Sequence, residues 1–197
     1  CPRFARYLAR VRSESEDVRG EATARVSTRA KTETVVICAV FALYAAFLLK
    51  LLLFSRPPGS ERSINLIPFA SIAGYLFTDS AATARFAFGN VVGNILVFAP
   101  LGAYLAVLTR RSLAKNMLII VAVSVAVEII QGVFALGASD IDDVILNGLG
   151  GLLGILVYRL LLSILRTRAR VRTVIAVVSI VAVPVFAYLL FVIRLRM

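Results

Sequence analysis

Five long apolar segments dominate the sequence and restrict the folds that the chain can adopt. They cover roughly residues 34–54, 86–108, 117–136, 141–165 and 173–193. Each reaches the roughly 20 residues that a helix needs to cross the hydrocarbon core of a bilayer. Because 60% of the 197 residues are hydrophobic, too many for a soluble domain of this length, we predict an all-α fold: a polytopic membrane helix bundle with about five transmembrane helices.

The basic residues predict the orientation of this bundle. The net charge is +11, and most of the 22 Lys and Arg residues lie before residue 34, in 109–116 and in 166–172. These regions fall on one side of the membrane if the segments alternate in direction, and Lys and Arg favour the cytoplasmic side. We therefore predict a multi-pass protein of the cell membrane with a cytoplasmic N-terminus and an external C-terminus. Basic residues spread by loop, without interleaved aromatic residues, argue against a nucleic-acid partner.

One membrane domain with two flanking regions is expected. Residues 1–33 are predicted to be a basic cytoplasmic tail, flexible or weakly helical. Residues 34–165 form the membrane domain, and 166–197 form a basic loop and the fifth transmembrane helix. Residues 64–77 are mostly apolar but too short to span, and Pro68 interrupts a continuous helix. We expect them to form an external interfacial segment.

Histidine and cysteine usage excludes several kinds of site. The chain has no histidine, which removes the commonest general base and any zinc site with histidine ligands. Its two cysteines are Cys1 and Cys38, which give neither a disulfide framework nor thiol-metal spacing. Because the sequence begins at Cys1 rather than methionine, we expect the natural N-terminus to lie further upstream.

Polar side chains inside the second span share one helical face. Asn90 and Asn94 are four residues apart and therefore project from the same side of the helix. Gly89 and Gly93 form a GxxxG pair beside them, which would let a neighbouring helix approach closely. The asparagines either bond across helices for packing or contribute to a binding site.

The third span carries the most costly polar group. Glu128 and Gln131 are three residues apart and share a face. A charged side chain at the centre of a membrane helix costs about 2.5–3.5 kcal/mol on insertion scales, so Glu128 should face protein or water. It is either a buried acid that locks the bundle or part of a functional site.

The fourth span begins with an acidic stretch. Asp140 and Asp142 suit the start of a helix, where acids cap it and complement its dipole. Capping does not explain Asn147, nearly two turns further on, so Asp143 and Asn147 favour a site. The same face continues as a stripe suited to helix packing: Gly150, Gly151 and Gly154.

Topology brings these polar groups to one depth. The second span starts on the external side, the third ends there and the fourth starts there. At 1.5 Å per residue their polar side chains lie within roughly 12 Å of the external boundary. The predicted polar site comprises Asn65, Asn90, Asn94, Glu128, Gln131, Asp140, Asp143 and Asn147.

Four ordered motifs resemble those of the VanZ-like family of bacterial membrane proteins. They are INLIPF (64–69), GNVVGNILVFAPLG (89–102), VEIIQ (127–131) and DIDDVILNGLGGLLG (140–154). The resemblance covers roughly residues 40–158 and implies a small multispanning protein of the cell envelope. The family is named for a protein associated with low-level teicoplanin resistance, and its molecular activity is not established. The characteristic polar positions of the family fall on Asn65, Asn94, Glu128, Gln131, Asp140, Asp143 and Asn147.

This chain departs from the family pattern at one point. Many members carry an arginine shortly before the acidic block, where this chain has GAS at 137–139. The counter-charge would then come from elsewhere, and Arg62 or Arg85 in the external loop is the expected source.

Three functions compete at this stage, and no catalytic residue is assigned. In the first, the protein binds or masks an amphiphile at the outer leaflet: a membrane lipid, a lipid-linked cell-wall component or a lipoglycopeptide such as teicoplanin. In the second, it is a membrane enzyme acting on a lipid-linked phosphate or glycolipid. Glu128 would then act as general acid or base, or Asp140, Asp142, Asp143 and Glu128 would hold Mg²⁺, and no other cofactor is expected. In the third, it is a proton-coupled transporter with Glu128 as relay, and a homodimer through the glycine stripes would supply further spans.

Overall fold

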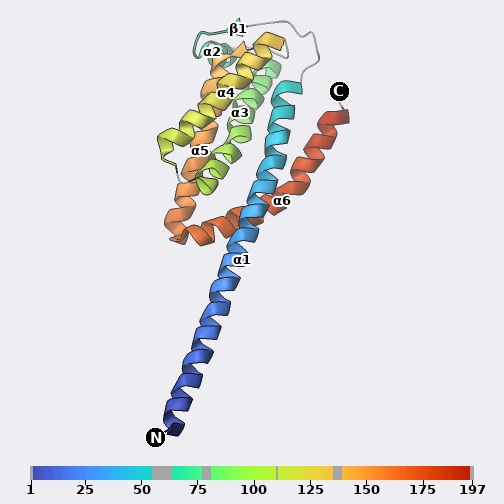
Figure 1. Ribbon diagram of the computed structural model, residues 1–197. Helices are drawn as coiled ribbons and strands as arrows, with labels where there is room; N and C mark the ends of the chain where they lie inside the picture. The colour runs from blue at the N-terminus through green and yellow to red at the C-terminus, as the bar shows by residue number, and fades with distance from the viewer. Residues whose placement is uncertain (1, 55–63, 77–80, 110, 135–138, 196–197) are drawn as a thin grey trace.

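The computed structural model describes residues 2–54, 64–76, 81–109, 111–134 and 139–195. These residues form six helices and two very short strands (Figure 1). The predicted all-α helix bundle is confirmed. In chain order the elements are α1 (Pro2–Phe54), β1 (Ile64–Asn65), α2 (Ala70–Leu76), α3 (Ala81–Leu108), α4 (Leu113–Phe134), β2 (Ser139–Asp140), α5 (Ile141–Leu165) and α6 (Arg168–Leu195).

Four helices in the described part of the chain are long and apolar enough to cross a membrane. They are Val26–Leu53 of α1, Phe88–Leu108 of α3, and the whole of α4 and α5, and they match the first four predicted spans. The fifth predicted segment lies in α6, which contains Pro184. A proline inside a helix bends it, and Figure 1 shows α6 crossing α1 before it turns toward the end of the bundle opposite the N-terminus.

Residues 2–33, predicted to be a flexible or weakly helical tail, are the first part of α1 and continuous with the first span. Alanine, arginine and glutamate are frequent here, and these residues have high helix propensity. Arg29 and Glu33 also pair at 3.1 Å, one turn apart. Figure 1 shows this part of α1 projecting beyond the other helices.

Helices α3 and α5 form the most intimate pair in the bundle, and small residues on α5 allow it. A Cβ atom at Gly150 would overlap the backbone of Ile95, and one at Gly154 would overlap the carbonyl of Ala99. No rotamer change can relieve an overlap with backbone. Gly150 and Gly154 are therefore covered by α3 of the same chain, whereas a Cβ atom at Gly151 would meet the Ile120 side chain of α4.

Tyrosines join α1, α3 and α6. Tyr44 is buried on α1, and its hydroxyl donates to the carbonyl of Val97 at 2.6 Å. The Tyr44 and Tyr104 rings lie 5.8 Å apart, within the range of favourable aromatic contacts. The Tyr104 hydroxyl is 2.9 Å from that of Ser179 on α6. Each phenol thus buries its ring while its polar end keeps a hydrogen bond.

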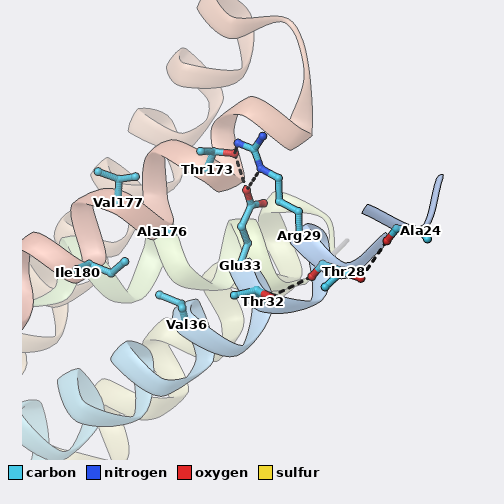
Figure 2. A pocket seen from close by; sticks show the side chains of 10 residues that line it. All are labelled: Ala24, Thr28, Arg29, Thr32, Glu33, Val36, Thr173, Ala176, Val177 and Ile180. Atoms are coloured by element: carbon cyan, nitrogen blue, oxygen red, sulfur yellow. Dashed lines mark hydrogen bonds and ion pairs between the residues drawn. The ribbon is translucent and has the colours of Figure 1, made fainter. Parts of the chain in front are cut away.

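A polar network also fixes α6 against α1. Arg29 donates from Nε to Glu33 at 3.1 Å and from Nη2 to Thr173 at 3.3 Å, and the Thr173 hydroxyl donates to Glu33 at 2.7 Å. Figure 2 shows these three side chains beside a cavity of about 670 Å³, with Val36 and Val177 on its apolar side. Because the polar groups bond one another, we interpret the network as a link between the two helices.

The short elements cover the end of the bundle where α5 begins, which we call the polar end. Strands β1 and β2 pair in parallel, with Ile64 opposite Ser139 and Asn65 opposite Asp140. Residues 64–76, which we call the flap, comprise β1, a turn and α2. Phe69, just before α2, lies in the left-handed region at φ 65°. The segment expected at the interface thus folds as strand, turn and short helix, and most of the apolar side chains before α2 are exposed: Ile64, Leu66, Ile67 and Phe69.

Candidate functional site

Asp140 joins the flap to α5. It is the N-cap of α5, and its carboxylate accepts the backbone N–H of Asp142 at 2.9 Å. The same side chain accepts from Asn65 Nδ2 at 3.1 Å and from the hydroxyl of Ser71. Asn65 in turn accepts the N–H of Ile67 at 3.1 Å. Asp140 and Asn65 therefore hold the strand pair and the start of the flap in place.

Asp142 caps a different helix from its own. It is only 1% exposed, and its two oxygens accept the N–H of Phe69 at 2.5 Å and of Ile72 at 3.1 Å. These are donors at the start of α2, which a carboxylate stabilises through both hydrogen bonding and the helix dipole. The bond to Phe69 also fixes the residue with the left-handed backbone. Asp142 thus fastens the flap to the bundle.

Glu128 reaches the same region from α4. It is 7% exposed, and its Oε2 accepts the backbone N–H of Asp140 at 2.7 Å. This bond connects α4 to β2. A buried carboxylate that accepts a backbone amide is stabilised where it lies, and here it positions the residue that caps α5.

Asp143 faces α3 and forms a second polar group. Its Oδ1 accepts from Asn94 Nδ2 at 2.6 Å and from Asn90 Nδ2 at 3.4 Å. These three side chains line a cavity of about 210 Å³ together with Gly89, Gly93, Gln131, Leu51, Leu52 and Val97. We call this cavity the amide pocket, because three of its polar groups are carboxamides.

Gln131 closes the α1 side of the amide pocket. Its Nε2 donates to the carbonyl of Leu52 at 2.8 Å. Its Oε1 is buried and has no hydrogen-bond partner among the described residues. A buried acceptor without a partner is costly, so this oxygen is suited to a donor from a bound molecule.

Gly89 and Gly93 border open space. A Cβ atom at either position would meet nothing within 4 Å among the described residues. The sequence suggested helix packing for this GxxxG pair, but both glycines line the amide pocket instead. Their missing side chains make room there.

Asn147 lies apart from both groups. It is 1% exposed on α5, and its Nδ2 donates to Ser124 of α4 at 2.8 Å. Its Oδ1 is buried without a partner in the described part of the structure. The predicted site residues are thus divided into a flap clamp (Asn65, Glu128, Asp140), the amide pocket (Asn90, Asn94, Gln131, Asp143) and the interhelical Asn147.

The structure does not describe the predicted counter-charge, and it arranges the predicted metal ligands differently from a metal site. Arg62 lies outside the described residues, and so does the side chain of Arg85. Within the described residues, no group of three or more acidic or cysteine side chains is arranged to hold a metal ion. Asp140, Asp142 and Glu128 instead accept backbone amides.

Three partners in these networks were not identified from the sequence. Ser71 bonds both Asn65 and Asp140, and its place two residues after INLIPF is the only sequence signal for it. Ser124 lies one turn before Glu128, so its helical face could have indicated it. The Leu52 carbonyl is a backbone group, and nothing in the sequence marks it.

Comparison with known proteins adds two matches. The sequence model of the VanZ/LLP1 family matches residues 41–163. Protein VanZ from Enterococcus faecium is 33% identical over 129 residues, which are 61% of this chain and 72% of that protein. No solved structure matches the chain. The region matched by the family model contains both the flap clamp and the amide pocket.

Proposed function

Because this chain belongs to the VanZ/LLP1 family, we propose that it is a cell-envelope membrane protein that binds an amphiphile at the outer leaflet. The amide pocket takes part of the polar head, and the flap lies in the membrane interface beside it. The amphiphile is a membrane lipid, a lipid-linked cell-wall component or a lipoglycopeptide. Binding it changes its exposure at the cell surface.

The observation that carries this proposal is the chemistry of the amide pocket. Asn90, Asn94 and Gln131 offer carboxamides, and Asp143 offers a carboxylate. Such a lining suits hydroxyl, amide and amine groups, as in sugars and peptides, better than it suits a phosphate anion. The volume of about 210 Å³ is below the roughly 300–1,000 Å³ of pockets that enclose whole drug-sized ligands. The pocket therefore takes part of a head group, and the remainder of the ligand lies outside.

The flap supplies the apolar complement. Ile64, Leu66, Ile67 and Phe69 expose their side chains next to the bundle. Fully burying a side chain of this size contributes about 1.5–3 kcal/mol, so contact with lipid or an acyl chain is favourable. Asp140 and Asp142 anchor the flap, which keeps this apolar surface close to the amide pocket.

The roles of the acids support binding rather than catalysis. A lipid-phosphate enzyme with Mg²⁺ would need several carboxylates directed at one ion. Asp140, Asp142 and Glu128 each accept backbone N–H groups at the flap and at the start of α5. Their hydrogen bonds are accounted for by the fold.

The test is teicoplanin susceptibility of a sensitive host that expresses the chain. Wild type is expected to raise the inhibitory concentration of teicoplanin several-fold. The increase should be much smaller for the same glycopeptide without its acyl chain. Gly93→Leu adds bulk where a Cβ atom meets open space in the amide pocket, and Asp143→Asn removes the charge of the pocket, so both are expected to return the host to its original susceptibility.

The matched control is Ala114→Leu, which adds bulk at an exposed position on α4. It should behave like wild type, and immunoblots of membrane fractions should show equal amounts of all variants. If wild type leaves susceptibility unchanged, the link to teicoplanin is wrong. If both pocket variants accumulate and protect as wild type does, the amide pocket is not the binding site.

A further inference from the structure

A second polar cavity lies at the end of the bundle opposite the polar end. It has a volume of about 190 Å³ and is lined by side chains from the end of α3, the start of α4, the last turns of α5 and the start of α6. Its polar lining consists of Thr109, Arg111, Asn116, Tyr158, Arg159 and Arg168. The rest of its wall is apolar. We call it the arginine pocket.

The charge of this cavity is unbalanced. Three arginines line it and no acidic residue does, and all three arginines are exposed. Among the described residues, no acidic side chain lies within salt-bridge distance of Arg111, Arg159 or Arg168, whereas Arg29 pairs with Glu33. Three like charges around a small space repel one another, and an anion bound between them would relieve this repulsion.

A buried side chain adds an uncharged donor. Asn116 is 2% exposed, and its Oδ1 accepts from the Thr109 hydroxyl at 3.0 Å. Its side-chain amide also lines the cavity, and the amide nitrogen is a hydrogen-bond donor. Such a donor beside three arginines matches a group with several acceptor oxygens, and guanidinium groups bind phosphate oxygens in pairs.

We propose that the arginine pocket binds a phosphate group, either in the head of an anionic membrane lipid or as free phosphate. This site is separate from the amphiphile site of the proposed function. The predicted orientation places it in the cytoplasmic leaflet, where basic pockets between transmembrane helices bind anionic head groups. The two cavities differ in chemistry, since one has a carboxylate and carboxamides and the other has arginines without a carboxylate.

The experiment separates the two phosphate sources. In the first arm, native mass spectrometry measures phosphatidylglycerol retained by the detergent-solubilised full chain, relative to phosphatidylcholine. In the second arm, the chain in phosphatidylcholine nanodiscs is titrated with inorganic phosphate at constant ionic strength, and thermal unfolding is followed. The variants are Arg159→Gln and Arg168→Gln, and the control is Arg170→Gln, an exposed arginine outside the pocket.

Binding is expected in at least one arm. Each pocket variant should weaken it about fivefold, which corresponds to ~1 kcal/mol per arginine near a membrane surface, and Arg170→Gln should leave it unchanged. Phosphatidylglycerol retention without a phosphate effect identifies a lipid head group, and the reverse identifies free phosphate. Binding in neither arm overturns the proposal. An equal loss of binding in Arg170→Gln also overturns it, because this result would show that the general surface charge attracts the anion.

Discussion

Replacing Asp142 is expected to release the flap while the helix bundle stays folded. The Asp142 carboxylate accepts the N–H groups of Phe69 and Ile72. Hydrogen bonds to a charged group contribute about 1.5–3 kcal/mol each, so Asp142→Ala removes about 3–6 kcal/mol of favourable interaction. Removing a buried charge returns part of its desolvation cost. We therefore expect a net loss of about 3 kcal/mol in the free energy of flap opening.

Hydrogen exchange measures this loss directly. A change of about 3 kcal/mol corresponds to roughly a hundredfold faster exchange at the amides of Phe69 and Ile72. Asp142→Asn retains one acceptor oxygen but directs an NH₂ group at the second amide, so its effect should be intermediate. Ser163→Ala, an exposed change at the other end of α5, is the control and should leave flap exchange unchanged.

Two outcomes would refute this reasoning. If Asp142→Ala leaves exchange at Phe69 and Ile72 as in wild type, the carboxylate does not hold the flap. If exchange rises equally throughout α3 and α5, Asp142 stabilises the whole bundle. The close packing of α3 on α5 does not involve Asp142, and this is why we expect a local effect.

The remaining predictions concern glycines and a tyrosine, and thermal unfolding in nanodiscs checks each. Gly154→Ala should destabilise the protein by about 1–3 kcal/mol, because its Cβ overlaps the Ala99 carbonyl; an unchanged midpoint would contradict the close packing. Gly93→Ala should leave stability unchanged or raise it by up to about 1 kcal/mol, since its Cβ meets open space. Tyr44→Phe should cost about 1 kcal/mol through loss of the hydrogen bond to Val97, and a stabilised variant would show that this bond has no net value.

Hydropathy was sufficient to predict the class of fold, because lipid requires backbone groups to be satisfied within each segment. Helices α3, α4 and α5 begin and end near the predicted limits, whereas α1 ends at its predicted limit but begins at Pro2, far before it. The depth of the polar residues could also be predicted, since it depends only on residue count and helix rise. Asn94 and Asp143, on different helices at one depth, do meet.

Depth does not determine rotation about a helix axis, and this limited the prediction of the site. Asn147 was placed near Asp143 by depth and sequence spacing, yet it faces Ser124 of α4. Asp142 suited the cap of its own helix, but the folded flap brings the start of α2 to it from 70 residues away in sequence. Neither contact can be inferred without the packing of several helices and the turn at Phe69.

The side chains at opposite ends of the same helices give the two cavities different linings. Helix α5 contributes Asp143 to the amide pocket and Arg159 to the arginine pocket. The arginines of the second suit a phosphate head group, and the carboxamides and carboxylate of the first suit a head group with hydroxyl or amine groups. Because α3 packs closely on Gly150 and Gly154 of α5 between these ends, this helix contact separates the two cavities. This arrangement favours separate recognition of different head groups in the two leaflets over passage of one ligand between the cavities.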